Sequence, residues 1–204
     1  MSYGHMFYGV DLDKLKAIYG SKDENLLADL LRAQAQELKD NDKYFEEEIE
    51  GGGFPATKQA LREIVVGAFG TYEGAEAIYG YALKIICGHI GHRVGADDVA
   101  NVADHPYASQ LVASGPPIPI PYDETDFPEI GFLSRTQISE EINRIDAAPK
   151  KTRRGVISTT LSLLTGGRAG RQMTADDLAQ DMAAYRRTLT EALEKKLAVV
   201  SFRH

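Results

Sequence analysis

The sequence is poor in the residues and motifs that would identify a function. Cys87 is its only cysteine, and it contains no tryptophan. A small secreted domain usually carries an even set of cysteines, so a single thiol favours a reducing compartment. The chain also lacks a Gly-Xaa-Ser-Xaa-Gly elbow, a Cys-Xaa-Xaa-Cys pair and a dinucleotide-binding fingerprint. We therefore expect no catalytic constellation and no cofactor.

Long hydrophobic runs are missing as well. No apolar stretch approaches the roughly 18 residues of a membrane span, and residues 1–10 lack the basic and then apolar pattern of a signal peptide. These two absences predict a cytoplasmic protein with no membrane partner.

Charge is unevenly distributed along the chain. The net charge is −7, yet six basic residues and no acidic residue lie between 148 and 174. The rest of the chain, with 17 basic and 30 acidic residues, therefore carries −13. This balance makes nucleic acid an improbable general partner. Within a single domain spanning 1–204, we predict that residues 150–172 form a mobile basic insertion or loop.

Hydrophobic periodicity predicts helices between two terminal strands. A strand over residues 2–10 and another over 197–202 enclose helices at 11–20, 23–39, 57–68, 73–89 and from 134 and 174 onwards. Residues 46–48 are acidic and precede three glycines, which indicates a solvated break. The predicted fold class is α+β, a helix-rich single domain whose small sheet includes strands from both chain termini. The expected core residues are Leu61, Ile64, Ile78, Ile85, Leu178, Met182, Tyr185 and Val199.

A proline-rich segment over 115–121 is the most distinctive stretch of the chain. Its prolines exclude a helix and an interior strand, so it should lie extended over the surface. Ile118 and Ile120 should anchor it to the core. With its aromatic neighbours Tyr107, Tyr122 and Phe127, the segment could form a rigid ridge for a partner or a plain structural cover, and the sequence favours neither.

Three stretches resemble a bacterial domain of unknown function. The first is Met-Ser-Tyr-Gly at 1–4, which runs into Val-Asp-Leu-Asp-Lys-Leu at 10–15. The second is Ser-Gly-Pro-Pro-Ile-Pro-Ile-Pro at 114–121, followed by Phe-Pro at 127–128 and Ile-Gly-Phe-Leu at 130–133. The third is a helix containing Tyr185 that runs into Leu-Ala-Val-Val-Ser-Phe at 197–202. The arrangement is also distantly similar to YfbM-like proteins. This resemblance, over about a quarter of the chain, implies a mixture of helix and strand and no established activity.

Metal and acid–base chemistry have weak candidates. His89 and His92 are one helical turn apart and His105 follows, but Gly91 should end the helix between the first two, so no metal is expected. Cys87 lies on an apolar helix and is interpreted as a buried small hydrophobe. The carboxylates within 123–129 lack calcium-loop spacing and are typical of a solvated acidic loop.

Three functional hypotheses remain. The first is a non-enzymatic protein that binds another protein, with a basic partner such as a toxin domain favoured by the acidic body. The second is an anion or nucleic-acid binder that uses the 150–171 segment, where Gly residues and arginines could hold an anion. The third is an uncharacterised hydrolase. The candidate binding residues of the first two hypotheses are Tyr107, Tyr122, Phe127, Arg153, Arg154, Arg168 and Arg171.

Overall fold

The protein has an α+β fold, as its sequence predicts. In the computed structural model, the structure describes residues 5–48, 55–72, 74–95, 114–124, 128–147 and 175–203. These residues contain seven helices and four strands. In chain order they are β1 His5–Val10, α1 Leu12–Ile18, α2 Glu24–Ala33, α3 Ala35–Glu48, α4 Thr57–Val66, α5 Glu76–Ile90, β2 His92–Val94, β3 Glu129–Leu133, α7 Arg135–Ala147, α10 Ala175–Glu194 and β4 Ala198–Arg203.

The sheet joins the two ends of the chain. Its strand order is β2-β1-β4-β3 and every neighbouring pair is antiparallel. The first and last strands form the central pair, in register from His5 opposite Arg203 to Val10 opposite Ala198. The predicted sheet with strands from both termini is thus confirmed. The two outer strands were not predicted, because β2 is short and polar and β3 directly follows Pro128.

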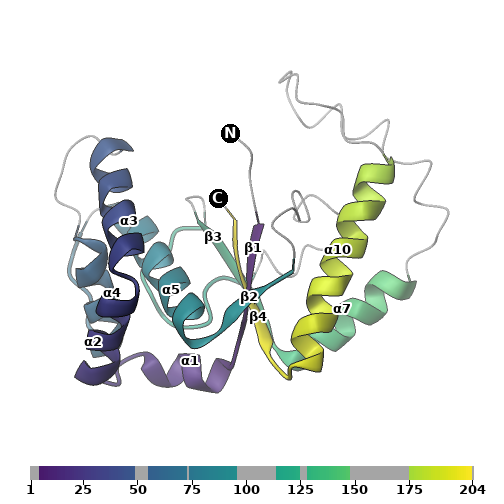
Figure 1. Ribbon diagram of the computed structural model, residues 1–204, viewed down its shortest axis with the longest axis horizontal. Helices are drawn as coiled ribbons and strands as arrows, with labels where there is room; N and C mark the ends of the chain where they lie inside the picture. The colour runs from purple at the N-terminus through teal and green to yellow at the C-terminus, as the bar shows by residue number, and fades with distance from the viewer. Residues whose placement is uncertain are drawn as a thin grey trace.

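The sheet lies between two helical layers, with α1 to α5 on one side and α7 and α10 on the other (Figure 1). Side chains alternate across a strand, so each strand serves both layers. In β1, Val10 belongs to the core beneath α1 to α5, whereas Phe7 belongs to the core beneath α7 and α10. Phe202 and Val199 of β4 divide in the same way. We call these two layers the α1–α5 side and the α7–α10 side.

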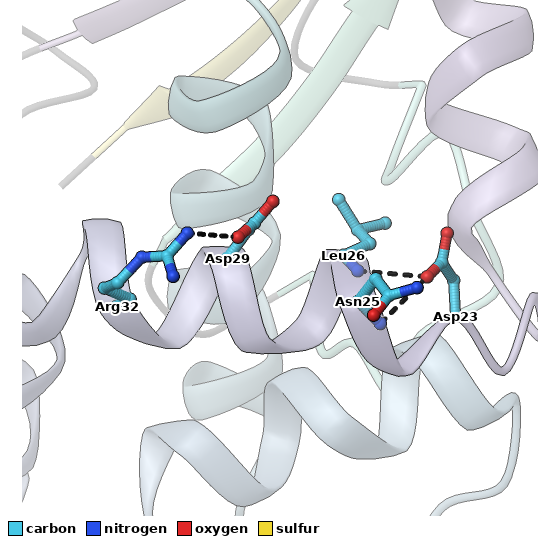
Figure 2. Close-up of polar contacts among 5 residues, drawn as sticks. All are labelled: Asp23, Asn25, Leu26, Asp29 and Arg32. Atoms are coloured by element: carbon cyan, nitrogen blue, oxygen red, sulfur yellow. Dashed lines mark hydrogen bonds and ion pairs between the residues drawn. The ribbon is translucent and has the colours of Figure 1, made fainter.

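The predicted single helix over 23–39 is wrong. Two helices replace it, with a break at Gln34, and the second continues through the acidic residues 46–48 that were expected to form a break. Asp23 opens α2, its Oδ1 accepting hydrogen bonds from the backbone N–H groups of Asn25 and Leu26, both 3.0 Å away (Figure 2). Leu38 and Phe45, seven residues apart, are both buried. Seven residues make two helical turns, so this pair holds α3 against the core past the predicted end.

Helix α5 is the centre of the α1–α5 side, as predicted. Its buried residues include Ile78, Tyr79, Ala82, Ile85 and Ile86. The helix ends at Ile90, before the expected terminator Gly91. Seven of the eight predicted core residues are buried; the surroundings of the eighth, Leu178, lie outside the described side chains.

The last helix pair also forms largely as the sequence indicates. The capping box at the start of α7 is present, because the Ser134 N–H donates to Gln137 Oε1 at 2.9 Å and the Gln137 N–H donates to Ser134 Oγ at 3.4 Å. Within the described parts of the chain, no helix combines the length and the apolar character that crossing a membrane requires.

Candidate interaction surface

The proline-rich segment lies along the outer edge of β3. Ile118 and Ile120 are buried, as expected. The Tyr122 hydroxyl accepts a hydrogen bond from the Ile130 N–H at 3.1 Å. Ser114 Oγ accepts from the Phe132 N–H at 2.6 Å and donates to the Phe132 carbonyl at 3.0 Å. Side-chain hydroxyls therefore occupy backbone groups that an edge strand would otherwise expose.

Tyr122 accordingly has a structural role in covering β3. Burial is the main cause that raises the pKa of its hydroxyl, and the ring packs against the core of the α1–α5 side. The other six predicted binding residues lie outside the described residues: Tyr107, Phe127, Arg153, Arg154, Arg168 and Arg171. The same is true of the predicted basic insertion at 150–172, so the ridge and the anion site stay predictions.

His92 and Glu129 have separate partners. His92 is in β2, and its Nε2 lies 3.0 Å from Lys195 Nζ, which also donates to Glu191. Glu129 forms an ion pair with Arg203 across β3 and β4 at 3.0 Å. In the described ranges, no group of three His, Cys, Asp or Glu side chains is placed to hold a metal ion. His105 and Asp126 lie outside those ranges.

Cys87 is fully buried, as its position on the apolar helix indicated. Burial raises the pKa of its thiol well above the usual value. A reactive thiol needs an exposed, electropositive site, so this residue is a packing group.

The most prominent exposed aromatic side chain lies on α3. Tyr44 is 49% exposed and is the one large hydrophobic residue that is exposed in the described part of the chain. Its ring centroid is 5.4 Å from that of Phe45 and 6.2 Å from that of Tyr81 on α5, and Phe45 and Tyr81 are 5.3 Å apart. Because Phe45 is buried, this Tyr44 cluster (Tyr44, Phe45 and Tyr81) holds an exposed ring on a fixed base.

Helices α2 and α3, the second of which carries Tyr44, are strongly acidic. Residues 24–48 contain eight acidic and three basic residues, which accounts for −5 of the net charge of −7. Some of these carboxylates have local roles: Asp29 pairs with Arg32 (Figure 2), and Asp42 accepts from the Thr57 N–H at the start of α4, 2.6 Å away. Exposed Asp40 lies four residues before Tyr44, and so on the same face of α3. The surface thus combines an aromatic anchor with negative charge.

Sequence reasoning missed this surface because it ended the helix too early. With residues 46–48 interpreted as a break, Tyr44 had no place on a helical face. The seven-residue spacing of Leu38 and Phe45 was the signal that could have extended the helix.

A buried carboxylate on the α1–α5 side was also missed. Glu63 of α4 is 7% exposed and accepts four hydrogen bonds. The donors are Gln59 Nε2 at 2.9 Å, the Gly70 N–H at 3.1 Å, the Tyr72 hydroxyl at 3.3 Å and the Tyr79 hydroxyl. Burial by itself raises the pKa of Glu63, but these bonds outweigh it and hold the pKa below its usual value. With every acceptor engaged, Glu63 ties the turn after α4 to α5.

Buried polar groups on the α7–α10 side lack such partners. His5, Glu141 and Tyr185 are at most 2% exposed, and among the described residues both His5 ring nitrogens, Glu141 Oε1 and the Tyr185 hydroxyl have no hydrogen-bond partner. Glu141 Oε2 is paired with Arg144. Burial, reinforced by the charge of Arg203, lowers the pKa of His5 to about 4. These residues come from β1, α7 and α10, and the described residues form no ligand cage around them.

The family of the chain is shown by a match over its whole length. Residues 1–204 match the model of a domain of unknown function, DUF7691, and the chain therefore belongs to that family. No curated protein matches the chain, and no solved structure does. The expected membership of a family of unknown function is confirmed, while nothing links the chain to YfbM-like proteins.

Proposed function

We propose that this member of the DUF7691 family acts by binding another protein, and that the partner presents a basic surface to α3. The observation that carries the proposal is Tyr44, an exposed ring held in place by Phe45 and Tyr81 on the most acidic part of the chain. Tyrosine is enriched among the residues that dominate binding energy at interfaces. A ring that is already fixed loses little conformational entropy when a partner covers it.

The acidic residues around Tyr44 supply the specificity. Complementary charge speeds the encounter with a basic partner and disfavours acidic competitors. A lysine or arginine of the partner can contact the Tyr44 ring while neighbouring carboxylates accept its hydrogen bonds. This placement moves the proposed binding surface from the proline-rich segment, whose Tyr122 is engaged with β3, to α3.

The partner can be captured by a photo-reactive benzoylphenylalanine placed at Tyr44 in the native host. The same reagent at exposed Lys58 on α4 is the matched control. A partner crosslinked from position 44 and not from position 58, and identified by mass spectrometry as a basic protein, is the expected result. Equal crosslinking from both positions would contradict the proposal.

The purified pair then allows a quantitative test. Tyr44→Ala should weaken binding by about tenfold or more, the usual effect of truncating an aromatic anchor. Asp40→Asn should weaken it less and reduce its sensitivity to salt, whereas Glu140→Gln on α7 should have no effect, although both carboxylates are exposed. Binding that is unchanged by Tyr44→Ala would place the interface elsewhere.

A further inference from the structure

Tyr44 ends an exposed row of three side chains along α3. Gln36, Asp40 and Tyr44 follow one another at four-residue spacing, and all three are exposed. Residues four apart lie on the same face of a helix, with their Cβ atoms about 5–6 Å apart. The three side chains therefore form one continuous surface about two helical turns long. We call it the α3 stripe.

The polar end of the α3 stripe offers hydrogen-bond acceptors. Gln36 Nε2 donates to Asp40 Oδ1 at 2.8 Å. Since a carboxylate only accepts hydrogen bonds, the Gln36 amide turns its N–H group toward Asp40 and leaves its own oxygen for another donor. Among the described residues, no donor reaches Asp40 Oδ2 or Gln36 Oε1. The two side chains thus hold each other in place and present acceptor atoms to an incoming group.

The aromatic end of the α3 stripe is open to a cation. Phe45 is buried, and the Tyr81 ring already has Lys84 of the same chain, whose Nζ lies 5.4 Å from the ring centroid. Tyr44 is 49% exposed, and in the described part of the chain no cation lies over its ring. A cation within about 6 Å of an aromatic centroid is attracted by the face of the ring. Tyr44 is thus the ring of the Tyr44 cluster that a cation of the partner can reach.

We infer that the α3 stripe binds an arginine side chain of the basic partner. A guanidinium is flat, with five N–H donors in its plane and no acceptor. It can stack on the Tyr44 ring while N–H groups at its edge donate to Asp40 Oδ2 and Gln36 Oε1. A lysine ammonium is a strongly hydrated point charge and has no flat fork with which to make both kinds of contact. Arginine recognition at this stripe rests on the function proposed above and names the residue that the partner contributes.

Net charge by itself would not select arginine. Exposed Lys39 and Lys43 lie one residue before Asp40 and Tyr44, on the next face of α3. Both lysines repel any cation at the α3 stripe, so they disfavour arginine and lysine alike. The preference comes from directional contacts, the ring face and the two acceptors, which a guanidinium can use together.

Two synthetic peptides of equal length and charge measure the preference on the purified full chain. One alternates arginine with glycine, and the other alternates lysine with glycine. Fluorine NMR of protein labelled with 3-fluorotyrosine follows Tyr44, whose signal is the one missing from Tyr44→Phe. The arginine peptide should shift this signal at a concentration about tenfold lower than the lysine peptide, which is the effect of one additional charge-assisted hydrogen bond. Equal concentrations would overturn the inference.

Variants of the α3 stripe test the source of the preference. Asp40→Asn replaces the acceptor carboxylate by a neutral amide, so it should weaken binding of the arginine peptide more than binding of the lysine peptide. Gln36→Ala should act in the same direction with a smaller effect, because it removes a neutral acceptor. Glu140→Gln on α7 is the matched control and should leave the preference unchanged. A preference for arginine that survives Asp40→Asn in full would also overturn the inference.

The outcomes separate arginine recognition from the proposed function. Equal shifts by both peptides reject the selection of arginine and leave the basic-partner proposal standing. A peptide that shifts every tyrosine signal alike binds by charge alone, which rejects a specific site at the α3 stripe. If neither peptide shifts the Tyr44 signal, arginine recognition is rejected, and crosslinking from position 44 decides the proposed function by itself.

Discussion

The two sides of the sheet differ in how well their buried polar groups are hydrogen-bonded. On the α1–α5 side, the buried carboxylate of Glu63 has four hydrogen-bond donors. On the α7–α10 side, His5, Glu141 and Tyr185 are buried with polar atoms that find no hydrogen-bond partner in the described part of the chain. A satisfied buried network stiffens its surroundings, whereas an unsatisfied buried group costs about 1–3 kcal/mol.

This difference explains where the candidate surface lies. Tyr44 projects from a helix of the α1–α5 side, whose buried residues form one cluster that also includes residues of β1, β3 and β4. A surface on such a base is already in its binding conformation. The α7–α10 side has two described helices over a smaller core, and its unsatisfied groups are suited to hold buried water.

The largest effect should come from truncating the core on each side. Ile85→Ala on α5 should destabilise the fold by about 2–5 kcal/mol, toward the upper part of that range, because helices and the sheet enclose the site. Leu189→Ala on α10, an equally buried position, should lie toward the lower part, because a two-helix layer can relax into the cavity. Urea denaturation of both variants compares them directly. A greater loss of stability from Leu189→Ala than from Ile85→Ala would contradict the expectation that the α1–α5 side is the more rigid.

Acidification should weaken the α7–α10 side through His5. Above pH 6.5 this imidazole is neutral in both the folded and the unfolded chain and contributes nothing to the pH dependence. Between pH 6.5 and about 4 the unfolded chain binds a proton that folded His5 does not, so stability falls as pH falls, by about 2 kcal/mol at pH 5. His5→Phe should remove this part of the loss between pH 7.5 and 5. A variant with an unchanged pH profile would show that His5 is accessible to protons in the fold.

Removing a satisfied hydroxyl should cost stability. Tyr79→Phe deletes one of the four donors to Glu63 and should destabilise the protein by about 1–2 kcal/mol at pH 7. Since the pKa of Glu63 is lowered in the fold, its contribution is present above the ordinary carboxyl pKa and is lost as pH falls through the lowered value. The difference between Tyr79→Phe and the native chain should therefore shrink in acid. A difference that persists at low pH would assign the effect to packing.

The matched deletion on the other side should have the smallest effect. Tyr185 is as deeply buried as Tyr79, but its hydroxyl makes no hydrogen bond. Tyr185→Phe should change stability by less than about 1 kcal/mol, in the stabilising direction, because no bond is lost and a desolvated polar atom is removed. A loss as large as that of Tyr79→Phe would mean that a buried water satisfies this hydroxyl.

Local signals in the sequence predicted much of the fold. Helices α1 and α2 begin where the sequence predicts, at side-chain caps of Asp11 and Asp23, because a side-chain cap needs only residues within one turn. The capping box of Ser134 and Gln137 formed for the same reason. The short strands β2 and β3 were missed because three or five residues beside turns carry too little periodicity to identify a strand.

The candidate site was harder to predict than the fold. Tyr122 was expected at a binding ridge, but its hydroxyl meets a backbone N–H in β3, eight residues away. Glu63 gave no sign of burial, because its donors come from a turn and from another helix. Tyr44 acquires its setting from Tyr81, which lies beside it only because α3 packs near α5.

The sequence by itself determined the α+β class, the pairing of the chain ends, the central place of α5 and the acidic character of residues 24–48, since each of these follows from local periodicity, caps or composition. Only the tertiary structure decided which polar groups are satisfied and which aromatic ring remains exposed. The physical reason is that burial and hydrogen bonding depend on atoms brought together from distant parts of the chain. Glu63 and Tyr185 illustrate it: both are polar residues in amphipathic helices, yet one gains four donors and the other none.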